Sequence, residues 1–246
     1  MRVEAFSIRL RRRGKIEATD LGIRLCQQAA RSVFACYLRI YVPVLLLAIA
    51  SFELAYWAPT LVIWWAKPWL DRSVLFVLSR AAFGQTTTFR DLWQAQRDVW
   101  WRQLLVTLTW RRLSPWRSLT QPVYQLEGLS GWKLRKRVVQ IRGDHRNTGL
   151  LITTAFSLAE LALWSALLSL ALWFVPGEQQ FNWTAMFLEN EHPGQLASYV
   201  TFGAYAVIVA FLEPFYVAAG FALYLNRRVE LEAWDVEQEL RRAFTR

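Results

Sequence analysis

Residues 196–225 read LASYVTFGAYAVIVAFLEPFYVAAGFALYL, an apolar run in which Glu213 is the only charged residue. As a helix with a rise of 1.5 Å per residue, this run is ~45 Å long, whereas the hydrocarbon core of a bilayer is ~30 Å thick. Apolar runs of this length are typical of membrane spans, because core helices of soluble domains alternate apolar and polar residues at the helical period. We therefore expect an all-α integral membrane protein.

The rest of the chain adds further apolar segments, so that the sequence predicts four transmembrane helices. The first two form a transmembrane hairpin at 34–83, and the third and fourth lie within 149–226, connected by an outer loop at 176–195. The remaining segments are a basic leader with an amphipathic helix (1–33), a region of interfacial helices (84–148) and a charged helical tail (227–246).

The second span is the least apolar of the four. If this helix ended at Leu70 it would cover only ~18 Å, which is too short for a bilayer, whereas a helix that continues to Phe83 covers ~37 Å. We therefore favour the longer span. A re-entrant segment over 59–83 is the alternative.

Between the second and third spans, no stretch is apolar enough to cross a bilayer. Residues 89–113, FRDLWQAQRDVWWRQLLVTLTWRRL, predict one amphipathic helix with Trp on one side and Arg on the other, and a basic helix follows at 133–142. Another amphipathic helix is expected to start after Asp20, a residue type that caps helix N-termini. Such helices lie in the membrane interface with their apolar face toward the lipid.

Basic residues are concentrated in the leader, in 84–148 and in the tail, whereas the loop at 176–195 contains none. The positive-inside rule places segments rich in Lys and Arg on the cytoplasmic face. We therefore expect both chain ends in the cytoplasm and a multi-pass location in a bacterial inner (plasma) membrane. The net charge of +10 fits anionic lipid better than nucleic acid, because the basic clusters flank apolar spans.

Six charged residues within the spans are candidates for a buried cluster, because a charge near the centre of a bilayer costs ~2.5–3.5 kcal/mol. They are Glu53, Lys67, Asp71, Arg72, Glu160 and Glu213. The helical rise puts Lys67 and Glu160 at compatible depths, so a Lys67–Glu160 contact is predicted, with Glu213 as a competitor for Lys67. Such a cluster can hold helices in register or can form a proton or substrate pathway, and the sequence leaves both interpretations open.

A second set of basic residues belongs to the cytoplasmic side and is suited to anionic lipid headgroups, at ~1 kcal/mol per residue near the membrane surface. It consists of Arg102, Arg111, Arg112, Arg117, Lys133, Arg135, Lys136 and Arg137. A site for a phosphorylated ligand is the alternative, because the guanidinium fork binds such groups through two hydrogen bonds at once.

The sequence offers no constellation of residues for catalysis, for a metal or for a cofactor. His145 and His192 stand alone in polar loops, where a histidine is usually solvated, and Cys26 and Cys36 lack the spacing of a zinc or redox site. Walker A, HExxH and GxSxG motifs are absent. We therefore expect that the protein is not an enzyme and needs no metal or other cofactor.

Residues 121–143, QPVYQLEGLSGWKLRKRVVQIRG, lead from a proline through an apolar–Glu–Gly turn into a basic helix that ends in Arg–Gly. This order resembles a motif of uncharacterised bacterial multi-spanning families, among them YciC-type inner-membrane proteins and the membrane domain attached to some glycerophosphodiester phosphodiesterases. The matching positions are Pro122, Glu127, Gly128, Arg142 and Gly143. Those families often have Arg–Ser within the basic helix, where this chain has Lys136 and Arg137.

The two ends of the chain, residues 20–47 and 212–242, are similar to a proteobacterial membrane protein that tends to be encoded with MoxR-type AAA+ ATPases. The resemblance implies a component of a membrane assembly, with other membrane proteins and such an ATPase as partners. We therefore expect a non-enzymatic inner-membrane subunit or scaffold of an envelope-related complex. The alternative is a transporter or a lipid-handling protein that uses the charged residues within its spans.

Overall fold

The computed structural model describes residues 13–102, 104–172 and 195–232, and in this part of the chain all regular structure is helical. The predicted all-α class is confirmed for these residues. The predicted outer loop lies outside them except for Gln195, as do residues 1–12 of the leader and 233–246 of the tail.

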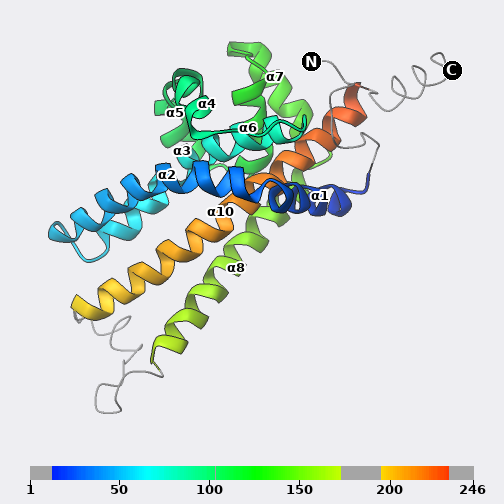
Figure 1. The fold of residues 1–246 in the computed structure, drawn as a ribbon. Helices are drawn as coiled ribbons and strands as arrows, with labels where there is room; N and C mark the ends of the chain where they lie inside the picture. Colours follow the sequence, from blue (N-terminus) through cyan, green and yellow to red (C-terminus); the bar gives the residue numbers. More distant parts are fainter. Residues whose placement is uncertain (1–12, 103, 173–194, 233–246) are drawn as a thin grey trace.

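The long helix α10 (Gln195–Glu232) is the centre of the bundle. It packs against α1 (Lys15–Gln28), α2 (Ala30–Ala50), α3 (Ala58–Ala81), α6 (Arg117–Leu126) and α8 (Arg146–Leu172), as Figure 1 shows. It can pack against several helices at once because its sequence is apolar on all sides. In the most apolar stretch of α10, 72% of the residues are buried. In that of α8 only 6% are buried, because α8 packs mainly against α10.

By length and composition, three helices can cross a membrane: Ala30–Glu53, Arg146–Leu170 and Ala197–Glu232. Several apolar helices of this length indicate association with a membrane. The helix α3 is not among them, because Lys67, Asp71 and Arg72 interrupt its apolar sequence. Its 24 residues nevertheless form one continuous helix, ~36 Å long, that does not fold back on itself.

The bundle has two different ends. At one end Phe52, in the turn between α2 and α3, packs against Tyr199 at the start of α10, with ring centroids 4.6 Å apart. At the other end Arg137 of α7 (Gly131–Arg142) pairs with Glu232, the last residue of α10. Figure 1 shows the same separation, with α7 beside the end of α10 and far from the hairpin turn. The basic helix α7, predicted at 133–142, is thus confirmed and marks one end of the bundle.

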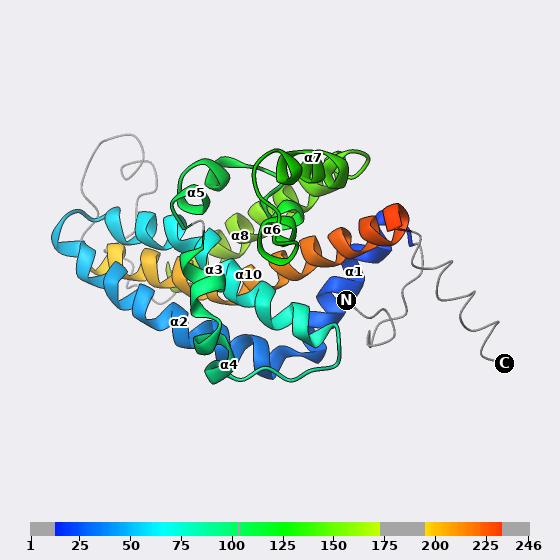
Figure 2. The same cartoon turned by 90° about the horizontal axis from the view of Figure 1, so that it is seen from above.

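The prediction of a single amphipathic helix at 89–113 is wrong. The segment consists of α4 (Phe89–Gln94), a π-helical turn (Arg97–Trp101), α5 (Leu104–Leu108) and a 3₁₀ turn (Trp110–Leu113). Hydrogen bonds to α3 bend it, since Trp100 Nε1 donates to Ser73 Oγ (2.8 Å) and Arg72 donates to the carbonyl oxygen of Asp98 (3.1 Å). A straight helix cannot bend around α3 in this way, and in Figure 2 the helices α4 and α5 lie on opposite sides of it.

The helix α1 is docked on α10 and starts earlier than expected. It begins at Lys15, so that Asp20 lies inside the helix and pairs with Arg24 (3.1 Å) instead of capping it. Its buried face consists of Ala18, Gly22, Leu25 and Cys26. At Gly22 a Cβ atom would lie 2.2 Å from the carbonyl oxygen of Ala218, so glycine is required for this close approach. Packing against α10 therefore fixes the position of α1.

A second glycine contact joins α6 to α10. A Cβ atom at Gly220 would lie 2.3 Å from Ser118 Cβ and 2.6 Å from the Ser118 carbonyl oxygen. Because Ser118 belongs to the first turn of α6, this contact brings the start of that helix against α10. The neighbouring side chain of Arg117 can then reach Glu213, two turns earlier on α10.

The close approach at Gly220 can be tested by adding one methyl group. Gly220→Ala forces α6 and α10 apart, and we expect it to destabilise the folded protein by about 1–3 kcal/mol. Gly203→Ala is the matched control in the same helix, because nothing lies within 4 Å of a Cβ atom there. The measurement is the thermal unfolding midpoint in mild detergent. Equal midpoints for the two variants would contradict the packing described here.

Candidate functional site

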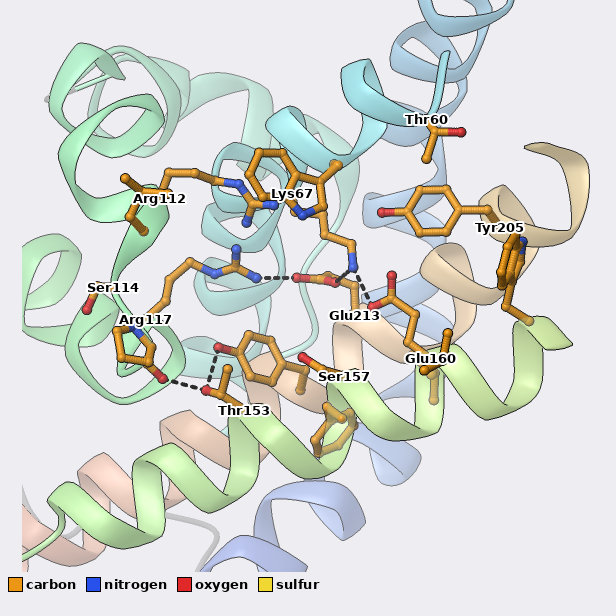
Figure 3. Close-up of a pocket in the computed structure, with 18 of the residues that line it drawn as sticks. Thr60, Lys67, Arg112, Ser114, Arg117, Thr153, Ser157, Glu160, Tyr205 and Glu213 are labelled. Carbon is orange, nitrogen blue, oxygen red and sulfur yellow. Dashed lines mark hydrogen bonds and ion pairs between the residues drawn. The ribbon is translucent and has the colours of Figure 1, made fainter. Parts of the chain in front are cut away.

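The side chain of Lys67 connects three long helices. Its Nζ atom, on α3, lies 2.6 Å from Glu160 Oε2 on α8 and 3.2 Å from Glu213 Oε2 on α10. Figure 3 shows the ammonium group between the two carboxylates. The predicted Lys67–Glu160 contact is confirmed, and Glu213 shares Lys67 with Glu160 instead of displacing it.

Arg117 belongs to the same cluster, although the sequence predicted it among the contacts to lipid headgroups. Its Nε atom lies 3.0 Å from Asp71 Oδ2, and its Nη2 atom lies 2.6 Å from Glu213 Oε1. The prediction for Arg117 is wrong because the Gly220 contact turns the start of α6 toward α10. No feature of the sequence distinguishes Arg117 from its neighbours Arg111 and Arg112.

Together these contacts form a chain of alternating charges, which we call the charge cluster: Glu160, Lys67, Glu213, Arg117 and Asp71. Its members come from α8, α3, α10 and α6. Lys67, Glu213 and Asp71 are 5, 4 and 0% exposed, so water cannot compensate their charges. A buried ion is tolerated when an opposite charge offsets its lost hydration, and each carboxylate of the cluster has a cation within 3.2 Å.

Two residues predicted for this cluster lie elsewhere. Glu53 is exposed in the turn between α2 and α3. Arg72 points away from the cluster, because successive residues of a helix are rotated by ~100° about its axis. It donates hydrogen bonds to Thr107 Oγ1 (3.1 Å) and to the carbonyl oxygen of Asp98. Spacing along the chain predicted the depth of these residues but not their direction.

A cavity of about 630 Å³ lies beside the charge cluster. The helices α3, α8 and α10 supply its walls, and the segment from Arg112 to Arg117 closes one side. Figure 3 shows the polar residues that line it, including Tyr205 and Ser157. The apolar lining includes Trp64, Phe156, Leu161, Trp164 and Leu212. The cavity is therefore amphipathic, because both charged and apolar side chains line it.

Arg112 lines this cavity and differs from the cations of the charge cluster. It is 9% exposed, and its guanidinium group lies over the Trp64 ring, 3.7 Å from the centroid. Among the described residues no carboxylate lies within ion-pair distance of it. Burial, together with the neighbouring charge of Arg117, lowers the pKa of the Arg112 guanidinium to about 10. The side chain of Arg112 turns inward to the cavity, and its contact with an anionic headgroup stays a prediction.

The remaining basic residues of the predicted headgroup set divide into two groups. Those whose side chains are exposed are Arg102, Lys133, Arg135 and Lys136. Arg111 stacks over the Tyr124 ring at 3.5 Å, and Arg137 bridges Glu127 and Glu232. Only the first group is free of internal packing and therefore well placed for headgroups.

The residues of the family-like motif lie within or directly after α6 and α7: Pro122, Glu127, Gly128, Arg142 and Gly143. Glu127 joins these helices to α10, since it accepts hydrogen bonds from Arg137 Nε and from the Tyr224 hydroxyl, both at 2.8 Å. Gly128 has a φ of +63°, a left-handed conformation that favours glycine. These contacts give the motif a structural role.

His145 is buried, although the sequence predicted a solvated histidine. It has no exposed surface, and its Nε2 atom lies 3.7 Å from Glu230 Oε1. Burial lowers the pKa of the imidazole and so favours its neutral form. Cys26 and Cys36 are also buried, as is common for free cysteines that pack as small apolar side chains. His192 lies outside the described residues.

No protein-family model matches the chain, and comparisons with curated proteins and with solved structures find no match. The similarity of residues 121–143 to multi-spanning families therefore stays an expectation. Function has to be inferred from the charge cluster, the cavity and the arrangement of the helices.

The pairing within the charge cluster can be tested by removing one cation. Lys67→Met leaves the carboxylate of Glu160 without its partner, and we expect a loss of about 3–5 kcal/mol in stability. Lys67→Met combined with Glu160→Gln should recover part of this loss, because the uncompensated charge is then gone. Lys133→Met, at an exposed position, should change stability by less than about 0.5 kcal/mol. Thermal unfolding and the yield of monodisperse protein measure these effects. A double variant as unstable as Lys67→Met would contradict the pairing.

Proposed function

We propose that this protein is a non-enzymatic subunit of a membrane complex, with four membrane-spanning helices and both chain ends in the cytoplasm of a bacterium. The helix α3 is the fourth span of this proposal. The charge cluster is the observation that carries it. Lys67 and Asp71 of α3 are paired with groups on α6, α8 and α10, which lets a helix with charges at its centre stay within the bilayer.

The pairing supports a structural role for the charge cluster over a proton pathway. A group that moves protons needs an acid or base whose charge can change at moderate cost. In the charge cluster each carboxylate is held by an ammonium or guanidinium group, and Glu213 is held by both Lys67 and Arg117. Loss or gain of a proton at Glu213 would therefore disturb contacts to two other helices.

Exposed apolar residues in the segments between α3 and α8 support the role of a subunit. Trp101, Leu105, Leu113 and Trp132 are each at least 65% exposed. These positions belong to the segments that connect α3 to α8, where the sequence is also rich in basic residues. Large exposed apolar side chains in such segments suit an interfacial layer or a partner protein. The resemblance of the chain ends suggests a MoxR-type AAA+ ATPase as a partner that binds the segments between α3 and α8.

Exposed basic residues support the proposed orientation. Arg102, Lys133, Arg135 and Lys136 are exposed, and the last three belong to α7. Contact of such residues with the anionic lipids of the cytoplasmic leaflet contributes ~1 kcal/mol each. The α7 end would then face the cytoplasm, and the turn between α2 and α3 would face the opposite side.

The four-span arrangement predicts that Glu53 and Arg135 lie on opposite faces of the membrane. Single Glu53→Cys and Arg135→Cys variants should react with an impermeant maleimide from the outer and the cytoplasmic side, respectively, in intact spheroplasts and inverted vesicles. The native cysteines give a low background, since both are buried and burial raises the pKa of the Cys26 thiol to about 12. Labelling of both variants from the same side would rule out a crossing by α3.

Purification in mild detergent tests the role of a subunit. We expect a stoichiometric partner protein to co-purify with the tagged chain. Trp132→Ala should weaken this association, whereas Trp57→Ala, which removes an exposed Trp at the other end of the bundle, should not. Recovery of a homo-oligomer without other proteins, under conditions that preserve the fold, would contradict the proposal and favour transport.

The cavity favours a second candidate function, the handling of lipids. Its volume lies within the range of ~300–1,000 Å³ typical of small-molecule sites, and its lining combines apolar walls with a few charged groups. The charge cluster would then have a structural role, while the cavity beside it holds a ligand.

A further inference from the structure

The surroundings of the cavity carry more positive than negative charge. The cavity and a small recess next to it, between α3, α5 and α6, are lined by five cations: Lys67, Arg72, Arg111, Arg112 and Arg117. The carboxylates that face them are Glu160, Glu213 and Asp71. All three carboxylates are paired with Lys67 and Arg117 in the charge cluster. The net positive charge therefore comes from the other arginines, of which Arg112 lines the cavity itself.

Apart from Arg117 Nε, which is ion-paired with Asp71, two donors that line the cavity have no hydrogen-bond acceptor among the described residues. They are Arg112 Nε and the hydroxyl group of Tyr205, and both atoms are shielded from solvent. A buried donor without an acceptor is costly, and a charged donor more so. Both residues line the cavity, and Figure 3 shows them on either side of Lys67. An acceptor with negative charge in the cavity would satisfy Arg112 and come within reach of Tyr205.

The cavity walls are suited to hydrocarbon. Trp64 of α3 and Phe156, Leu161 and Trp164 of α8 line it, and Leu161 is 57% exposed. Because α8 packs mainly against α10, only 6% of its most apolar stretch is buried. In a bilayer the exposed surface of α8 would border the acyl chains of lipids. A ligand could therefore enter from the membrane, and its acyl chain would lie between α3 and α8.

We infer that the cavity binds an anionic amphiphile, with a phosphate headgroup held by the Arg112 guanidinium and the Tyr205 hydroxyl and an acyl chain along Trp64 and Leu161. A guanidinium group suits phosphate because it offers parallel N–H donors and keeps its charge. The charge cluster takes no part as a ligand, since its groups are already paired. This inference deepens the lipid-handling function proposed for the same cavity and does not depend on the role of a subunit.

Competition between two lipids tests the inference. The purified full-length protein is mixed with equal amounts of phosphatidic acid and phosphatidylcholine that carry the same acyl chains, and bound lipid is counted by native mass spectrometry. We expect the wild type to retain phosphatidic acid preferentially. Arg112→Gln should reduce the retained phosphatidic acid about tenfold or more, because it removes a charge-assisted hydrogen bond. Arg90→Gln, at an exposed arginine outside the predicted headgroup set, should stay within about twofold of the wild type.

A second variant distinguishes a loss of lipid binding from a loss of the fold. Ser157→Phe fills the cavity from α8 and leaves every charge in place. It should melt like the wild type without lipid and yet lose most of the retained phosphatidic acid. Normal retention by a folded Ser157→Phe or Arg112→Gln variant would overturn the inference, as would equal retention of the two lipids by the wild type.

Soluble phosphate distinguishes a lipid headgroup from a free anion. Inorganic phosphate at millimolar concentration should not displace phosphatidic acid, because it lacks the apolar contacts along α3 and α8. Displacement by phosphate alone would overturn the assignment to an amphiphile. Neither result depends on whether a partner protein co-purifies, so the two proposals fail separately.

Discussion

The ammonium group of Lys67, held between the carboxylates of Glu160 and Glu213, is the contact on which the bundle depends. An ion of this kind is costly in hydrocarbon, and the cost falls only when opposite charges stand within a few ångströms. Because the two partners come from α8 and α10, α3 is stable in the bundle only when both of those helices are already in place. The same argument extends to Asp71, whose partner Arg117 comes from α6.

Close backbone contact at α10 makes this arrangement possible. Gly220 lets α6 approach α10, and Gly22 does the same for α1 on another part of that helix. The approach of α6 brings Arg117 to Glu213, so a small residue in one helix decides which arginine enters the charge cluster. Van der Waals packing of small residues is the main source of helix association where lipid surrounds the protein.

Three arginines that are close in the sequence have different surroundings. Arg111 stacks on Tyr124, Arg117 is paired with two carboxylates, and Arg112 faces a cavity without a carboxylate partner among the described residues. A buried cation without a counter-charge is unfavourable unless something else offsets it, which is why Arg112, and not the paired Arg117, points to a ligand.

The sequence by itself determined the helical class, the three long apolar helices and the depth at which Lys67 meets Glu160, because hydrophobic run length and helical rise are local properties. The crossing of the membrane by α3 stays a prediction. Tertiary structure alone decided that Arg117 and Arg112 turn inward, that Glu53 stays outside the charge cluster, that His145 is buried and that 89–113 breaks into short helices. These features depend on the rotation of each helix and on contacts between segments far apart in the chain, which no local pattern encodes.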